Sequence, residues 1–84
     1  MWTQLATKQL RRLTERAPGQ AIAVYDAVQW LAGRSAMAAL GRADPDGRRR
    51  RYWPVPPQGV FYAVRNRRLW VLEIRDARRR RAPW

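Results

Sequence analysis

Arginine is the residue type through which this sequence can act on another molecule. The 84 residues include 18 Lys or Arg against 6 Asp or Glu, and every basic residue except Lys8 is an arginine. A guanidinium presents a planar fork of donors suited to phosphates and carboxylates, but it does not deprotonate in proteins and is a poor general base. The formal charge of +12 therefore predicts an anionic partner, such as nucleic acid, a ribosome or an acidic protein.

The arginines concentrate in two runs, at 48–51 and 78–81, and a tryptophan follows each run within a few residues. Aromatic rings among arginines suit the stacking of unpaired nucleobases. We predict that target or nucleic-acid binding involves these runs and their neighbours, namely Arg48, Arg49, Arg50, Arg51, Trp53, Arg75, Arg79, Arg80, Arg81 and Trp84.

Several kinds of chemistry are excluded by residue types that the sequence lacks. Without histidine there is no Ser-His pair and no His-metal site, and without cysteine there is no disulfide or thiolate metal site. The absence of cysteine also fits a reducing cytosol. No apolar run approaches the roughly 20 residues of a membrane span, and the N-terminus lacks a signal-peptide pattern. We therefore expect a cytoplasmic protein without cofactor or metal.

A predicted β-hairpin at 59–78 is the element that must position the arginines. Two apolar runs, 60–64 and 69–74, flank a polar tip that contains Asn66. Their valines, aromatics and isoleucine favour a pleated, half-buried surface. The expected register pairs Val64 with Leu69, Ala63 with Trp70, Tyr62 with Val71 and Phe61 with Leu72.

Both faces of this hairpin are apolar, unlike a sheet that is wetted on one side. In the expected register, one face carries Phe61, Ala63, Trp70, Leu72 and Ile74. The other face carries Val60, Tyr62, Val64, Leu69 and Val71, with Glu73 at its end. A chain this short has little material to cover both faces. We therefore expect the second face to stay bare and to bind another polypeptide.

Two helices are predicted before the hairpin, as a helical hairpin within residues 3–33. Thr3 is a plausible N-cap of the first helix, and the second helix is expected from Pro18 to Ala32, where Gly33 ends it. The expected apolar stripes are Ala6, Leu10, Leu13 and Ala17 on the first helix and Ala21, Tyr25, Val28 and Ala32 on the second, which Ile22, Val24 and Leu31 widen.

The connection between the helices and the hairpin is predicted to contain two turns and one strand. Ser35 is a candidate cap for a short turn at 36–40, and residues 44–47 have the Asp-Pro-Asp-Gly pattern of a β-turn. Because proline cannot donate to a ladder, the strand with prolines after residue 53 is expected to be short, broken or at a sheet edge. We thus predict one α+β domain over residues 1–84. It packs the helical hairpin on an antiparallel sheet of about three strands, at 48–78, and ends in a basic tail at 79–84.

The order of these pieces resembles the RelE/ParE superfamily of bacterial toxins. The resemblance lies in Thr3-x-x-Ala6-x-Lys8-x-Leu10-x-x-Leu13, in Leu31-Ala32, in Leu40-Gly41-Arg42, in the apolar strands 60–64 and 69–74, and in the exit Asp76-Ala77-Arg78-Arg79. The family normally has a strand before its first helix, whereas only Met1 and Trp2 precede Thr3 here. The resemblance therefore implies a first strand that is missing or truncated.

This resemblance implies the toxin of a type II toxin–antitoxin (plasmid stabilisation) module, which an acidic and partly disordered antitoxin neutralises. The antitoxin is expected on the bare face of the sheet, at Val60, Tyr62, Val64, Leu69 and Val71. Such a partner can combine apolar burial with charge attraction.

The target divides the superfamily, because RelE-like toxins cleave mRNA on the ribosome and ParE-like toxins inhibit DNA gyrase. Arg78 matches the exit arginine that serves catalysis in RelE-like toxins, but Trp84 stands where they have a tyrosine, and no charge lies at Gly59 or Val60. The resemblance thus favours a gyrase inhibitor without catalysis of its own. Two alternatives are a ribosome-dependent mRNA endonuclease and a non-toxic basic module that binds nucleic acid.

Overall fold

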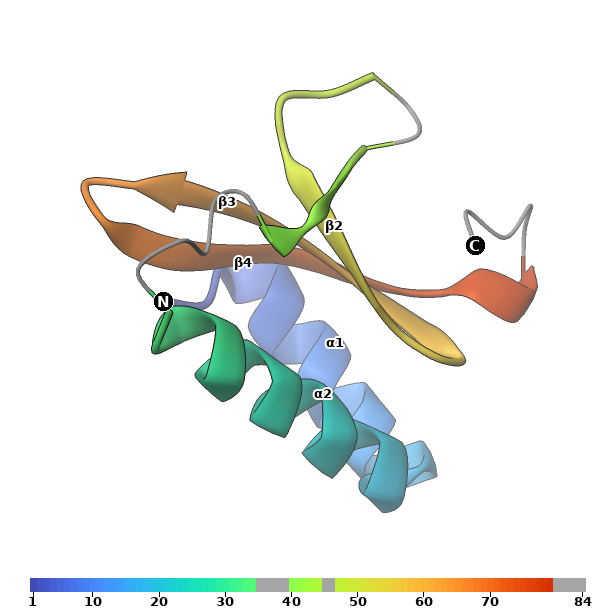
Figure 1. The fold of residues 1–84 in the computed structure, drawn as a ribbon. Coiled ribbons are helices and arrows are strands. Elements are labelled where there is room, and N and C mark those ends of the chain that lie inside the picture. Colours follow the sequence, from blue (N-terminus) through green and yellow to red (C-terminus); the bar gives the residue numbers. More distant parts are fainter. Residues whose placement is uncertain (35–39, 45–46, 80–84) are drawn as a thin grey trace.

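The chain folds into a helical hairpin that covers one side of an antiparallel sheet, as seen in a computed structural model that describes residues 1–34, 40–44 and 47–79 (Figure 1). The elements are α1 (Gln4–Arg16), α2 (Pro18–Ala32), β1 (Arg42–Ala43), β2 (Arg51–Val55), β3 (Gln58–Arg65), β4 (Arg68–Asp76) and the 3₁₀ turn η1 (Ala77–Arg79). The sheet order is β1-β2-β3-β4, and each neighbouring pair is antiparallel. The predicted α+β class is confirmed, and the short β1 brings the strand number to four.

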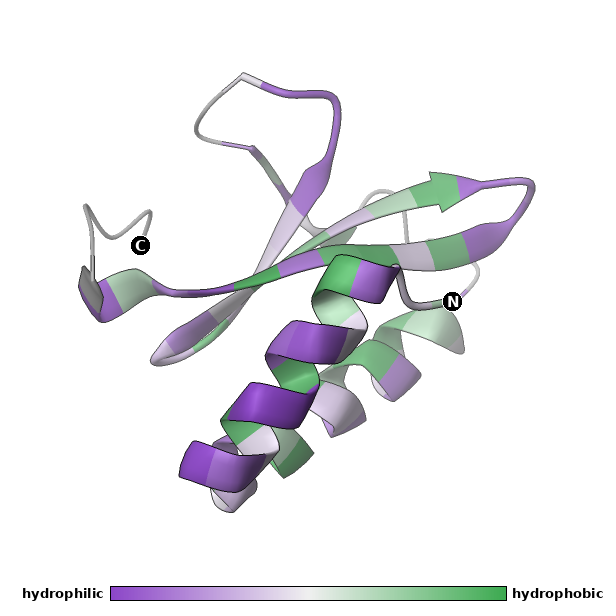
Figure 2. Ribbon diagram, turned by 180° about the vertical axis from the view of Figure 1, so that it is seen from behind, coloured by the Kyte–Doolittle hydropathy of each residue, from purple (hydrophilic) through white to green (hydrophobic). Residues whose placement is uncertain are grey.

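Both helices begin and end where the sequence predicts. The Thr3 hydroxyl accepts a hydrogen bond from the Ala6 amide at 3.2 Å, and Pro18 occupies the first turn of α2. The apolar stripe of α2 differs from the prediction. The buried row is Ala21, Val24, Val28 and Leu31. Tyr25 and Ile22 point away from the core and are 48% and 62% exposed. Figure 2 shows the hydrophilic side of α1 turned to solvent.

The β3–β4 hairpin keeps the predicted register only near its tip. Val64 pairs with Leu69, Ala63 with Trp70 and Tyr62 with Val71, as expected. Asn66 and Arg67 have φ values of 52° and 63°, as a two-residue turn of type I′ requires. A register shift between Phe61 and Tyr62 then pairs Phe61 with Glu73, so the predicted pair with Leu72 is wrong.

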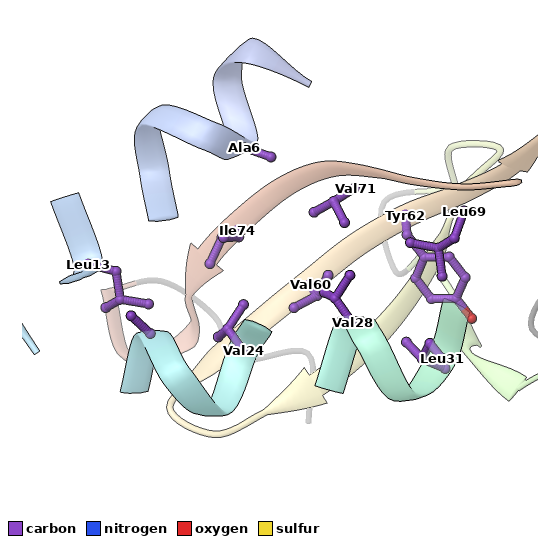
Figure 3. Close-up of a cluster of buried hydrophobic side chains, with 11 residues drawn as sticks. Ala6, Leu13, Val24, Val28, Leu31, Val60, Tyr62, Leu69, Val71 and Ile74 are labelled. Carbon is purple, nitrogen blue, oxygen red and sulfur yellow. The ribbon is translucent and has the colours of Figure 1, made fainter. Parts of the chain in front are cut away.

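This shift is a β-bulge, with Leu72 as the extra residue, and it changes which side of the sheet the end of β4 faces. Ile74 moves to the side of Val60, and Glu73 moves to the side of Phe61. Figure 3 shows Ile74 with Val60 and Val71 against the apolar residues of the helices.

The helices cover the sheet face that was expected to bind an antitoxin, so that prediction is wrong. Val60, Tyr62 and Val71 are fully buried, and they pack with α1 and α2 in one core. Leu69 is 3% exposed, and Val64 packs against the same core. With both faces apolar, the sequence does not reveal which face its own helices take. The bare face was the physical argument for a second polypeptide, and the toxin hypothesis loses that support.

Residues 1–3 lie along the outer edge of β4. Trp2 forms an isolated parallel bridge with Val71. The Val71 amide donates to the Met1 carbonyl at 2.8 Å, and the Thr3 amide donates to the Val71 carbonyl at 3.0 Å. Further along α1, the Gln9 side chain accepts a hydrogen bond from the Ile74 amide at 2.6 Å. These contacts cover part of the outer edge of the sheet.

The connection from α2 to β2 is described in part. The Gly47 amide donates to the Asp44 carbonyl at 3.0 Å, and Gly47 has a φ of 77°, which agrees with the predicted β-turn. The turn predicted at 36–40 with Ser35 as its cap falls largely outside the described residues. Across the described ranges, no helix has the length and apolar character needed to cross a membrane.

Candidate anion-binding face

The side of the sheet that faces away from the helices, here called the outer face, carries one row of functional groups across all four strands. The register pairs Arg42 with Tyr52, Tyr52 with Phe61 and Phe61 with Glu73. Residues that are paired across strands point to the same side, so these side chains share the outer face. Arg75 joins them because its partner Gly59 lies two residues before Phe61.

Two guanidiniums lie against the Phe61 ring at the centre of this face. The Cζ atoms of Arg50 and Arg75 are 4.0 Å and 4.8 Å from the ring centroid. Tyr52 packs beside the ring with a centroid separation of 4.9 Å. The arginine stems and the tyrosine leave Phe61 fully buried, so the outer face is not a bare apolar surface either.

Two carboxylates fix these guanidiniums. Glu73 Oε1 lies 3.0 Å from Arg50 Nη1 and 3.3 Å from Arg75 Nη2. Asp44 pairs with Arg50 Nε, and its side chain is fully buried. Burial disfavours the charge of Arg50, but the hydrogen bonds and charges of Asp44 and Glu73 outweigh this effect and raise its pKa. Arg50 is thus a fixed cation, with a side chain only 8% exposed.

Arg50 also has a hydrogen-bond donor that is not used, because its buried Nη2 makes no hydrogen bond. A buried donor without an acceptor costs about 1–3 kcal/mol. An anion that reaches this atom would recover that cost. Arg75 is more accessible, with a side chain 34% exposed, and Arg42 is exposed at the edge of the sheet.

The hydroxyl of Tyr52 is a further titratable group of the outer face. Its pKa is raised to about 12, chiefly by burial, against the opposing charges of Arg42 and Arg75. The hydroxyl therefore stays protonated at neutral pH and does not serve as a general base. The described groups of this face can attract and hold an anion, while its carboxylates are engaged with arginines.

The predicted run Arg48–Arg51 does not form one surface. Arg48 and Arg49 are exposed before β2, and Arg50 points to the outer face. Arg51 pairs with Tyr62 on the opposite side of the sheet, where its Nη2 donates to the Gly41 carbonyl. Successive residues of a strand point to alternate sides, and this rule separates neighbours in the run.

The other predicted site residues are also dispersed. Trp53 lies on the helix side, where its ring stacks on Trp30. Arg78 is exposed and pairs with Asp76, with 3.0 Å between Nη2 and Oδ2, and this hydrogen bond raises the pKa of Arg78. Arg79 ends η1, and Arg80, Arg81 and Trp84 fall outside the described residues.

Sequence reasoning missed Arg42, Asp44, Tyr52 and Glu73 as members of this face. A signal for Glu73 was present. The apolar alternation of Leu69 and Val71 resumes at Ile74 rather than residue 73, and such a break in a two-residue period is typical of a bulge.

Within the described ranges, no cluster of three or more acidic, His or Cys residues could hold a metal ion. Comparison with protein-family models, with curated proteins and with solved structures finds no match to this chain, so its resemblance to RelE/ParE toxins stays a prediction.

Proposed function

We propose that this protein is a growth-inhibiting toxin of the RelE/ParE kind that binds its target, DNA gyrase, through the outer face and cleaves nothing itself. The observation that carries the proposal is the set of arginines fixed on that face by Asp44 and Glu73, beside a tyrosine that stays protonated. Fixed cations are suited to holding an acidic surface, since their position is set before the partner arrives.

Two further observations support the toxin reading. The element order, a helical hairpin followed by an antiparallel sheet and a basic exit, agrees with the resemblance in the sequence. The charge of +12 suits neutralisation by an acidic antitoxin. Such an antitoxin would bind elsewhere than the side of the sheet that packs on the helices, because that side is buried in the core. The proposal implies action in the cytoplasm, where gyrase works.

Growth of cells that express the chain tests this proposal. We expect arrest with DNA-damage signalling and filamentation. We also expect Arg42→Glu, which reverses a charge at the outer face, to restore growth. Arg11→Glu is the matched control, because it makes the same charge change at an exposed site on α1 and should leave the arrest intact.

Three outcomes would contradict the proposal. Prompt translation arrest with cut messages would favour the ribosome-dependent endonuclease. Growth without arrest at normal protein levels would favour a non-toxic nucleic-acid-binding module. Equal rescue by Arg42→Glu and Arg11→Glu would mean that total charge, rather than the outer face, is responsible.

A further inference from the structure

Two tryptophans and an arginine stack where the end of α2 meets β2, on the opposite side of the sheet from the outer face. The rings of Trp30 and Trp53 have centroids 5.8 Å apart and planes inclined by 27°. The Cζ atom of Arg34, one helical turn beyond Trp30, lies 4.2 Å from the Trp30 ring centroid. We call these three residues the tryptophan stack.

The Trp30 side chain is not required to bury the core. Val28 and Leu31 on the same helix are already 2% and 0% exposed, and Trp53 packs against the core from β2. Trp30 itself remains 46% exposed. An indole that is half in water and extends a planar stack outward presents the kind of surface on which nucleobases stack.

The charges around the stack favour an anionic ligand. Arg34 is exposed, and Arg51 lies two residues before Trp53 on the same side of β2. Arg51 Nε is buried without a hydrogen-bond partner. The nearest carboxylate along α2, Asp26, is one turn before Trp30 and is the single acidic residue of that helix. Basic groups therefore outnumber acidic ones at this place, as they do over the whole chain.

Pairing of a further strand is disfavoured at this edge. Beyond the contact of β1 with Arg51 and Tyr52, β2 contains Pro54, which has no amide hydrogen to donate to a neighbouring strand. Recognition here must use side chains rather than a backbone ladder.

We propose that the tryptophan stack is a docking site for an unpaired base of single-stranded nucleic acid. The base stacks on the indoles, and Arg34 turns from the Trp30 ring to a phosphate beside that base. Stacking on an aromatic side chain tolerates any base, so the site selects single strands over duplexes rather than one sequence. This site is separate from the outer face, and it does not depend on the proposed toxin activity.

Fluorescence anisotropy tests the site by measuring affinity at several salt concentrations. The probes are labelled oligo(dT) and oligo(U) of twelve nucleotides and a duplex of equal length. Trp30→Leu removes stacking while keeping an apolar side chain, and Trp30→Phe keeps a ring. We expect Trp30→Leu to weaken single-strand binding by about tenfold, and Trp30→Phe to weaken it much less. Comparison of oligo(dT) with oligo(U) shows whether the 2′-hydroxyl contributes.

Arg34→Gln and Arg12→Gln make the same charge change at the stack and on α1. Only Arg34→Gln should reduce the slope of log affinity against log salt by about 0.7. Equal binding by Trp30→Leu and the unchanged protein would overturn the proposal. So would equal affinity for duplex and single strands, because general charge attraction would then explain binding. Thermal unfolding of each variant separates a lost contact from a lost fold.

Discussion

At the scale of single residues, two glycines allow two buried tyrosine rings to lie directly on the backbone. A Cβ atom on Gly59 would stand 2.4 Å from Tyr52 Cε1, and one on Gly41 would stand 2.4 Å from the Tyr62 hydroxyl. Real Cβ atoms do not approach other atoms so closely. The outer face and the core thus each depend on a glycine that admits a tyrosine, so any larger residue at position 41 or 59 would displace that ring.

The hairpin turn offers a stabilising substitution. Arg67 has a φ of 63°, in a region that costs a non-glycine residue about 1 kcal/mol. We expect Arg67→Gly to raise the free energy of unfolding by about 0.5–1 kcal/mol. Arg65→Gly is the control, because Arg65 ends β3 and should lose stability when it becomes glycine. Urea unfolding measures both, and a loss of stability in Arg67→Gly would contradict the assigned turn.

At the scale of elements, the outer edge of β4 is covered by side chains and by residues 1–3. The Gln9 carbonyl oxygen accepts from the Ile74 amide, and the Thr3 hydroxyl donates to the Leu72 carbonyl at 3.1 Å. Side chains at the start of α1 thereby form hydrogen bonds with backbone groups of β4 that an additional strand would otherwise pair with. This arrangement protects part of the β4 edge from pairing with another chain.

Removal of the Gln9 contact should loosen the end of β4. We expect Gln9→Ala to lower the free energy of unfolding by about 1–3 kcal/mol, because the partly buried Ile74 amide loses its acceptor. Gln4→Ala, at an exposed position of α1, should cost much less. Amide hydrogen exchange gives the local readout. Unchanged protection of the Ile74 amide in Gln9→Ala would mean that the contact does not hold the edge.

At the scale of the whole molecule, features encoded by local patterns could be predicted from the sequence. The face of the sheet that the helices cover could not. Thr3 as a cap, Pro18 and Gly33 as helix ends and the turn at Asn66 depend on nearby residues alone. The face of the sheet that the helices cover depends on how they connect and on the bulge. The expected partner surface therefore proved to be the core.

The assembled fold also sets how stability responds to alkaline pH. Burial raises the pKa of Tyr52 to about 12, from an unfolded value near 10, and burial also raises the pKa of Tyr62. The folded state therefore favours the protonated phenols. The contribution of Tyr52 is fully present below pH 10 and is lost as the pH rises from 10 to about 12, and Tyr62 contributes in the same direction.

We expect the urea concentration at the midpoint of unfolding to fall over this pH range. In Tyr52→Phe this midpoint should fall less steeply, because the variant keeps the ring without the hydroxyl. Absorbance of tyrosinate reports the titration directly. Identical pH dependence in both proteins would contradict the burial of this hydroxyl.

The register of β4 beyond its bulge also decides what kind of surface the protein presents. Everything beyond Leu72 changes sides because of this bulge, so regular pairing of β4 with Leu72 opposite Phe61 would send Glu73 toward α1 and α2 and Ile74 toward the outer face. Arg50 would then lose Glu73 as a counter-ion, because Glu73 and Arg75 would both move to the side of the helices. A deletion of Leu72 itself would leave Glu73 opposite Phe61 and Ile74 opposite Val60, so this end of β4 can lose its extra residue and still keep the apolar core and the cationic outer face.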